Sequence, residues 1–388
     1  MTDCKPISSC PTCGDVTEHL VSWEFSGLGD SIFNYTAEFH YCPSCGLVYI
    51  SNISDGTLGR FYENECGYSQ KAHFCATAPE NIRKFEAYRR VLVEAGLQDC
   101  GVADIGCGRG GFLHWLAEGG WNSKCHGVDM DLRSIKEGIT ATGNDVTFCK
   151  GAVWDLPFGN ETQPLLTYFH VLEHIRDLSR LLAEANRVLR PGGHILIDVP
   201  DGENFDTTPV GTAFWPAIRE HVNHFSAASL CRALARNGFG VQHIIRQELP
   251  TPEFSYPSLM VLAQKGVPSV QSVGGSAKVA THIANSRQML RRRADELCLL
   301  KRKHSKLTFW GCASVLFSLL PMLTTESVAI CDASSEIQQT TWRGLPIHDP
   351  TETPIGGALI IVPYLHGDEI RTAARTLGWP EPSVFRLW

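Results

Sequence analysis

The chain has 388 residues, 43% of them hydrophobic, which is enough for two or three globular domains with ordinary cores. Its net charge of −7 argues against a large nucleic-acid-binding surface, and no apolar run is long enough to span a bilayer. The start of the chain shows no signal-peptide pattern, and most of the fifteen cysteines lie singly within apolar patterns. These features predict a cytoplasmic protein with reduced thiols that binds neither nucleic acid nor membranes.

Two Cys-x-x-Cys pairs lie within residues 1–55, Cys10 with Cys13 and Cys42 with Cys45. Four thiolates at this spacing are typical of one tetrahedral Zn²⁺ site. Residues 18–41 between the pairs alternate apolar and polar side chains, as a small antiparallel sheet does. We therefore predict a structural zinc ribbon, because four sulfur ligands leave no open position for a catalytic water. Two unrelated cysteine pairs are the alternative, and the repeated spacing argues against it.

A helix is predicted from Pro79 to Ala95, where apolar residues recur at helical spacing. It precedes the first strand of the next domain and could cover a ligand cleft there. Tyr62 and Tyr68 lie in a polar, aromatic segment before this helix. Two interpretations stay open for these tyrosines, contact with a substrate and a place on a surface loop.

Residues 102–111, Val-Ala-Asp-Ile-Gly-Cys-Gly-Arg-Gly-Gly, predict a strand, a tight turn and the start of a helix. Three glycines in the turn permit unusual backbone angles and let a ligand approach the main chain: Gly106, Gly108 and Gly110. The helix N-terminus adds unpaired N–H groups. Asp129 ends the next predicted strand, where a carboxylate can accept ribose hydroxyls. The turn suits a dinucleotide or S-adenosylmethionine, and a packing turn without a ligand is the alternative.

Predicted strands and helices alternate from residue 100 to residue 265, which favours a parallel, doubly wound α/β sheet. Strands are expected near 101–105, 124–129, 145–149, 164–170 and 194–199, and helices near 110–119, 132–141, 177–189 and 227–237. Two more strands, Gly240 to Gln247 and Leu259 to Gln264, are expected to complete the sheet with an antiparallel edge.

The segment from Cys100 to Lys265 resembles class I S-adenosylmethionine-dependent methyltransferases. The resemblance rests on Asp104 before Ile-Gly-Cys-Gly, His-Val-Leu-Glu-His at 170–174 and Leu-Arg-Pro-Gly-Gly-His at 189–194, in this order. It implies S-adenosylmethionine as cofactor, with these binding residues: Asp104, Gly106, Gly108, Gly110, Asp129, Met130, Ala152, Val153 and His170. The loop with Ala152 and Val153 would border the adenine, and Trp154 would lie against its ring or pack in the core. Near the methyl group, Glu173 would bind substrate or simply form a structural pair.

A second polar segment, residues 215–226, precedes a Ser-capped helix that begins near Ala227. It contains Glu220-His221 and Asn223-His224 within an otherwise apolar domain. Histidine titrates near neutral pH, and a neighbouring carboxylate can orient it. The segment is therefore a candidate source of acid–base groups.

The last third of the chain begins with a linker, 266–276, and a helix, 277–304, whose arginines we place on a solvated face in preference to a substrate phosphate. From residue 306 an α/β pattern resumes. Strands are expected at 306–310, 328–332 and 358–362, and helices at 315–323 and 368–377. This pattern predicts a small Rossmann-like domain. Its turn has one early glycine, Gly311, and does not predict a second bound dinucleotide.

The whole order resembles sugar C-methyltransferases that act on carbon 3 of nucleotide-linked 4-keto-deoxysugars. It consists of a four-cysteine ribbon, a methyltransferase domain with Glu-His-Val-Asn-His-Phe-Ser at 220–226 and a small C-terminal α/β domain. The resemblance implies that His221 removes a proton beside the ketone and that the enolate attacks the methyl group. It assigns further polar roles to Glu220, His174 and Tyr68. The sequence departs from the family at Ile218, where a tyrosine is common, and in its shorter turn at 311–315.

These observations divide the chain into a zinc ribbon at 1–55, a methyltransferase domain at 56–265, a linker and helix at 266–305 and a substrate-cleft domain at 306–388. The predicted function is C-methylation of a nucleotide-linked deoxysugar in natural-product biosynthesis by a monomer or homodimer. An O- or N-methyltransferase of another natural-product intermediate and a non-catalytic scaffold that binds S-adenosylmethionine are the alternatives. Activation of a carbon acceptor needs a base, which distinguishes the first hypothesis from the others.

Overall fold

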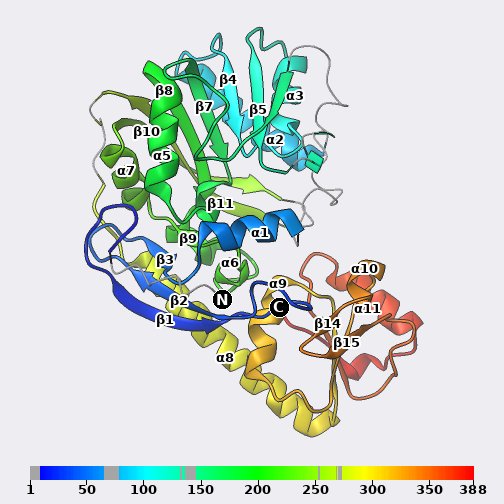
Figure 1. The fold of residues 1–388 in the computed structure, drawn as a ribbon. Helices are drawn as coiled ribbons and strands as arrows, with labels where there is room; N and C mark the ends of the chain where they lie inside the picture. The colour runs from blue at the N-terminus through cyan, green and yellow to red at the C-terminus, as the bar shows by residue number, and fades with distance from the viewer. Residues whose placement is uncertain are drawn as a thin grey trace. The chain divides into compact units, whose positions relative to one another are not determined.

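The computed structural model describes residues 9–64, 78–131, 133–134, 136, 146–251, 254–267, 269 and 273–388 (Figure 1). The chain forms two compact units. Unit 1 contains the described residues of Met1–His19, His40–Thr208 and Glu220–Ala280, and unit 2 contains Leu20–Phe39, Pro209–Arg219 and those of Thr281–Trp388. Tyr68 and most of the helix predicted near 132–141 lie outside the described residues.

A seven-stranded sheet in the order β10–β11–β8–β7–β4–β5–β6 forms the centre of unit 1. Its strands are β4 (Val102–Ile105), β5 (Cys125–Asp129), β6 (Val146–Lys150), β7 (Gln163–Phe169), β8 (Leu189–Pro200), β10 (Phe239–Pro250) and β11 (Ser255–Lys265). The five strands from β8 to β6 are parallel, which confirms the predicted parallel α/β sheet. Strand β11 is antiparallel to both β8 and β10 and so lies one place inside the edge. The two strands complete the sheet and form an antiparallel pair at its edge, as the sequence predicted.

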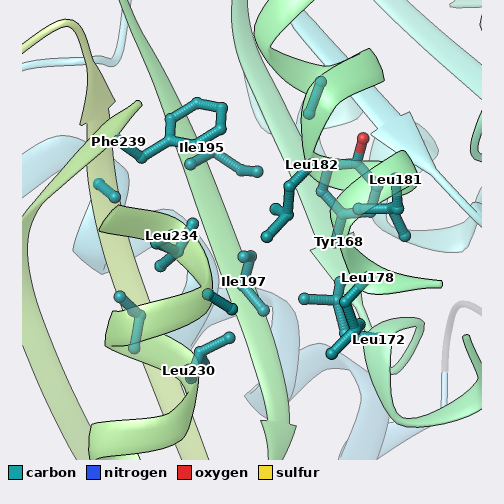
Figure 2. Packing of buried hydrophobic residues seen from close by; sticks show 14 of the residues in the cluster. Tyr168, Leu172, Leu178, Leu181, Leu182, Ile195, Ile197, Leu230, Leu234 and Phe239 are labelled. Carbon is teal, nitrogen blue, oxygen red and sulfur yellow. The ribbon is translucent and has the colours of Figure 1, made fainter. Parts of the chain in front are cut away.

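Four helices of unit 1 border this sheet: α2 (Pro79–Glu94), α3 (Gly111–Glu118), α5 (Leu178–Val188) and α7 (Ala227–Arg236). Because successive strand residues point to opposite faces, β8 contributes side chains to the packing on both faces of the sheet. Its Ile195 and Ile197 pack among leucines of α5 and α7 (Figure 2). The neighbouring Asp198 accepts a hydrogen bond from the Tyr88 hydroxyl of α2, with an O–O distance of 2.8 Å. Leucines and isoleucines buried in this way contribute about 1.5–3 kcal/mol each.

The cysteine-rich segment belongs to a four-stranded sheet in the order β1–β2–β3–β9. Its strands are β1 (Glu18–Glu24), β2 (Thr36–Tyr41), β3 (Val48–Ile50) and β9 (Asn223–His224), and helix α1 (Asp55–Asn64) follows β3. In β3 and β9, Tyr49 pairs with Asn223, and Ile50 N–H donates to Val222 O over 2.9 Å. The pairing holds the segment that contains His221 against the cysteine-rich part of the chain.

Unit 2 contains a six-stranded sheet in the order β14–β15–β13–β12–β16–β17. Its strands are β12 (Leu307–Trp310), β13 (Val328–Cys331), β14 (Thr341–Trp342), β15 (Leu345–His348), β16 (Ala358–Ile361) and β17 (Val384–Arg386). Its helices are α6 (Phe214–Ala217), most of α8 (Lys278–His304), α9 (Ser314–Leu319), α10 (Ser335–Gln338) and α11 (Gly367–Thr376). The helix predicted at 315–323 ends at Leu319 and continues as a 3₁₀ turn, where Pro321 has no N–H to donate. Across the described parts of both units, every helix is too short or too polar to span a membrane.

Candidate active site

The glycine turn follows β4 and leads directly into α3. Gly106, Gly108 and Gly110 all have positive φ, at 76°, 55° and 74°. A Cβ on Gly106 would lie 2.6 Å from Val171 Cγ2, and one on Gly110 would lie 2.2 Å from Phe148 Cζ. A Cβ on Gly108 would meet no atom within 4 Å. Two of the glycines are therefore needed for packing, and the third leaves space for a ligand beside the main chain.

Asp129, at the end of β5, holds this turn in place. Its Oδ2 accepts a hydrogen bond from Gly108 N–H, and its Oδ1 accepts one from Asp131 N–H, each over 2.8 Å. Burial raises the pKa of Asp129, although these backbone N–H groups favour its charged form. Each carboxylate oxygen has a further lone pair, so the group can still accept hydroxyls from a ligand.

Asp104 is buried on β4, two residues before the turn, with 5% of its surface exposed. Its Oδ1 accepts a hydrogen bond from Thr167 Oγ1 over 2.7 Å. Burial raises the pKa of Asp104 to about 7 against the effect of this hydrogen bond, and the charge of Asp129 adds to the rise. Burial of a charged Asp104 costs free energy, and a buried carboxyl with a raised pKa beside a glycine turn is typical of a functional site.

A cavity of about 500 Å³ opens beside the turn. This volume is within the usual range for small-molecule sites. Eight of the nine predicted cofactor-binding residues line the cavity: Asp104, Gly106, Gly108, Asp129, Met130, Ala152, Val153 and His170. Gly110 packs against Phe148 instead. Trp154 also lines the cavity, and Arg180 lies over its ring at 5.1 Å.

Helix α2 contributes residues to the cavity wall that the sequence patterns did not identify. Asn81 and Lys84 line it together with Tyr88, whose ring stacks on Phe169 at a centroid distance of 3.8 Å. Asn81 and Lys84 are three residues apart and therefore share one helix face. A polar pair on a helix face that is otherwise apolar was the signal that could have identified them.

His170 follows β7 in a left-handed conformation with φ of 56°. Its Nδ1 lies 3.1 Å from Glu173 Oε1, and its Nε2 lies 2.5 Å from the Tyr256 hydroxyl and 3.4 Å from Asp198 Oδ2. Burial opposes a charge on His170, but Asp198 and Glu173 outweigh it and raise its pKa to about 9. His170 is therefore cationic at neutral pH, and both ring nitrogens are occupied.

Glu173, His174 and His221 form a cluster in the wall of the same cavity. One carboxylate oxygen and one nitrogen from each ring lie within 4.8 Å of one another. Glu173 is 1% exposed, and its Oε2 has no hydrogen-bond partner among the described residues. His174 Nδ1 lies 3.1 Å from Glu220 O, so it is this nitrogen that carries a proton to donate. The structure thus brings His174 and His221 together with a carboxylate from η3 (Leu172–His174).

Two of the predicted catalytic residues, His221 and Glu220, and the nearby Tyr62 have different surroundings. Burial lowers the pKa of His221 well below its usual value, and the neighbouring histidines His174, His224 and His170 lower it further. Glu220 contributes its backbone oxygen to His174 and is absent from the cavity wall. Tyr62 lines the cavity, with its ring 5.8 Å from that of His174.

The four predicted zinc ligands, Cys10, Cys13, Cys42 and Cys45, bring their sulfur atoms within 4.8 Å of one another. Sulfur–sulfur distances are 3.4 Å for Cys13–Cys42 and 3.6 Å for Cys10–Cys45. Tetrahedral Zn²⁺ with Zn–S bonds of about 2.3 Å places its ligands about 3.8 Å apart. The first cysteine of each pair accepts a backbone bond of 2.8 Å, from Gly14 and Gly46 respectively. The geometry therefore fits a structural Zn²⁺.

Residues 81–244 match the family model of a methyltransferase domain. This segment is a class I S-adenosylmethionine-dependent methyltransferase domain. Its α/β fold is that of class I methyltransferases, with a parallel sheet that contains one antiparallel strand and a glycine turn after β4.

Three similar proteins illustrate the match. A probable S-adenosylmethionine-dependent methyltransferase of Mycolicibacterium smegmatis is 28% identical over 171 residues, which cover 42% of this chain and 62% of that protein. A phthiotriol/phenolphthiotriol dimycocerosates methyltransferase of Mycobacterium leprae is 28% identical over 123 residues, 31% and 45% of the two chains. The solved structure of a methyltransferase from Methanosarcina mazei is 21% identical with a TM-score of 0.38, over 43% of this chain and 93% of that one. The chain therefore spans less than two thirds of either curated relative.

Proposed function

We propose that this protein transfers the methyl group of S-adenosylmethionine to a small-molecule acceptor, at a carbon beside the ketone of a nucleotide-linked deoxysugar. One observation carries the proposal. The cavity beside the glycine turn also contains Glu173, His174 and His221, three side chains able to bind or move a proton. A carbon acceptor must lose a proton before it can attack a methyl group, so it needs such groups beside the cofactor.

The residues of the turn fit S-adenosylmethionine. The open side of Gly108 would admit the cofactor, and the carboxylate of Asp129 would accept the ribose hydroxyls. Met130, Ala152 and Val153 line the cavity just after β5 and β6 and would border the adenine. The cofactor supplies a methyl group on a positively charged sulfur. The residues around it fix the direction of attack. Positioning of this kind lowers the activation barrier by at most about 7–11 kcal/mol.

His221 is the proposed base at the acceptor. It lies in the cavity wall, and the Glu173 carboxylate in the same cluster can stabilise the imidazolium that forms when the proton is taken up. His174, Glu220 and Tyr68 remain proposed contributors to this step. A positioned base contributes about 10²–10⁴-fold to such a reaction.

The four cysteines are proposed to bind a structural Zn²⁺. Zinc would fix the two cysteine pairs, and strand β3 after the second pair aligns β9 and the segment that contains His221. Ser226 Oγ also donates to Cys45 O over 2.8 Å. The role of the metal would therefore be to hold the segment with His221 in place.

Mass spectrometry of the purified protein with S-adenosylmethionine and nucleotide-linked 4-ketosugars in deuterated water tests the proposal. We expect a mass gain of one methyl group and exchange of deuterium at the carbon beside the ketone. The exchange should disappear in His221→Gln. If the protein binds the cofactor but neither methylates nor exchanges any ketosugar, the proposed acceptor is wrong.

A further inference from the structure

The cluster of Glu173, His174 and His221 has the composition of a cation site. We propose that these three side chains bind a divalent transition-metal ion, with open coordination positions on the side of the cavity. The proposed metal is separate from the zinc of the cysteine cluster, and none of its three ligands is a cysteine.

Glu173 provides the first observation. One of its oxygens, Oε1, lies 3.1 Å from His170 Nδ1, while Oε2 is buried and has no hydrogen-bond partner within the described parts of the chain. A buried carboxylate oxygen without a partner costs free energy. The contact with His170 fixes the orientation of the carboxylate, and a cation between Oε2 and the two imidazoles would satisfy the remaining oxygen.

His174 provides the second observation. Its Nδ1–H donates to Glu220 O over 3.1 Å, so that Nε2 carries the lone pair. Histidine ligands in metal sites almost always donate their other ring N–H in this way, often to a backbone carbonyl. The tautomer of His174 is thus the one that a metal ligand needs.

The backbone around the cluster is held by hydrogen bonds between two segments. Val222 N–H donates to Glu173 O over 2.7 Å, and the side-chain amide of Asn223 donates to Leu172 O and Ile175 O over 3.0 Å and 2.7 Å. These bonds fix η3 against the residues that follow His221. A metal site needs such a frame, because its ligands must be held close to the coordination geometry.

Two imidazoles and one carboxylate suit a first-row transition metal better than Mg²⁺ or Ca²⁺, which prefer oxygen ligands. Metal–ligand bonds of about 2.0–2.2 Å place neighbouring ligands roughly 3–4 Å apart. The three ligand atoms lie within 4.8 Å of one another, slightly wider than a bound ion would hold them. Three protein ligands leave positions for an oxygen of the substrate.

The role of this metal rests on the proposed methyl transfer. The cation would lie beside the acceptor and would stabilise the negative charge that the acceptor oxygen acquires when the neighbouring carbon loses its proton. A nitrogen that binds a metal cannot accept a proton. The metal therefore changes one step of the proposed function. In the metal-loaded protein the cation would make the acceptor carbon more acidic, and its proton would pass to solvent water instead of to His221.

Titration with Co²⁺ tests the site directly. The protein is first loaded with one equivalent of Zn²⁺, which thiolates bind more tightly than Co²⁺, so that the cysteine cluster is occupied. We expect one Co²⁺ per chain to bind, with visible d–d absorption and without the intense thiolate charge-transfer band. His174→Gln and Glu173→Gln should each weaken this binding at least ~10-fold. His194→Gln, at a half-buried histidine of β8 outside the cavity wall, is the matched control.

Absence of Co²⁺ binding beyond the cysteine cluster, or equal binding by wild type and His174→Gln, would overturn the inference. The methyl-transfer assay on the zinc-loaded protein separates this result from a failure of the proposed function. Turnover of a ketosugar that does not respond to Co²⁺ removes the metal and keeps the proposed function. Co²⁺ binding at the cluster without turnover of any ketosugar removes the proposed acceptor and keeps the metal site.

Discussion

The turns that follow β4 in unit 1 and β12 in unit 2 share their backbone hydrogen bonds but differ in the space around them. Each turn follows a parallel pair of strands, β4 with β5 and β12 with β13. Gly106 N–H donates to Val128 O over 2.7 Å, and Gly311 N–H donates to Cys331 O over 2.9 Å. The first residue of each turn is therefore joined to the neighbouring strand by an equivalent bond.

A carboxylate holds each turn in the same way. Asp129 accepts from Gly108 N–H over 2.8 Å, and Asp332 accepts from Cys312 N–H over 2.7 Å. The second oxygen of each carboxylate accepts from the N–H group two residues further along the chain, over 2.8 Å and 2.9 Å. An acid at the end of the second strand is thus part of how this fold fixes its turn, with or without a ligand.

The two turns differ in the space beside their main chain. Gly108, which donates to Asp129, faces open space beside a cavity, whereas the residue that donates to Asp332 is Cys312, which carries a side chain. A Cβ on Gly311 would lie 2.4 Å from the ring of Pro363, much as one on the equivalent Gly106 would lie 2.6 Å from Val171 Cγ2. Helix α9 of unit 2 has six residues, against eight for α3. Because both turns share these hydrogen bonds, the bonds alone do not predict a ligand site. Space beside the main chain and reactive side chains facing that space are also needed.

Substitution of a reactive side chain in the cavity of unit 1 should change turnover more than any other change discussed below. His221→Gln should lower turnover about 10²–10⁴-fold, because the variant lacks the side chain that serves as the base or as a ligand of the proposed metal. Affinity for S-adenosylmethionine should stay within about twofold of wild type, since His221 belongs to the cluster with Glu173 and His174 and not to the glycine turn. Steady-state kinetics and isothermal titration calorimetry measure the two quantities. Wild-type turnover in the variant would remove His221 from the reaction.

The second effect concerns Asp104, whose position is occupied by Phe309 in unit 2, two residues before the first glycine in each case. The pKa of Asp104 is raised by burial to about 7, above the value of about 3.9 for an unfolded aspartate. The stability that this group contributes is complete below about pH 4 and is lost as the pH rises towards 7. Asp104→Asn should therefore gain stability relative to wild type over this range, by at most about 4 kcal/mol.

Denaturant unfolding of the protein without cofactor, at pH 4, 6 and 8, measures this difference between Asp104→Asn and wild type. Thr167→Val is the companion variant, because it removes the hydrogen bond that favours the charged carboxylate. It should raise the pKa of Asp104 and steepen the loss of stability with pH. A difference between Asp104→Asn and wild type that is constant across pH would show that Asp104 does not titrate in this range.

The sequence predicted the elements of both units well where apolar residues follow a clear period. The five parallel strands of unit 1 and the strands β12, β13 and β16 of unit 2 lie close to their predicted positions. Strands β12, β13 and β16 are buried throughout and therefore appear in the sequence as continuous apolar runs. Strands β14, β15 and β17 each have a single buried residue, so no such run marks them. The place of β11 inside the edge depends on which long-range pairing forms, and periodicity within a strand does not encode this.

The carboxylate partner of His221 shows a similar limit. Adjacency in the chain favoured Glu220 as its partner, and that assignment remains a prediction. Neighbouring residues of an extended chain point in opposite directions, so adjacency is a weak guide to contact. The carboxylate that lines the cavity with His221 is Glu173, which lies 48 positions earlier in the chain. Only the pairing of η3 with the segment before β9 reveals this neighbour.

Substitution of Gly108 in unit 1 and of Gly311 in unit 2 should have different effects on cofactor binding and stability. Gly108→Val should lower affinity for S-adenosylmethionine about 100-fold, because the added carbons occupy the space next to the main chain. It should also cost about 1–2 kcal/mol of stability, the price of a positive φ for a residue with a side chain. Gly311→Val should destabilise the protein more, through collision with Pro363, and leave cofactor affinity unchanged. Calorimetry and denaturant unfolding on both variants measure these effects.

The smallest effect concerns the two carboxylates that hold the turns. Asp129→Asn should weaken S-adenosylmethionine about tenfold, or about 1.4 kcal/mol, because one acceptor of the ribose hydroxyls becomes a donor. Asp332→Asn changes the same hydrogen bonds in unit 2 and should leave cofactor affinity unchanged, with a similar loss of stability in the two variants. Titration calorimetry and unfolding curves on both proteins make the comparison. Equal cofactor affinity for Asp129→Asn and wild type would mean that Asp129 only holds the turn, as Asp332 does.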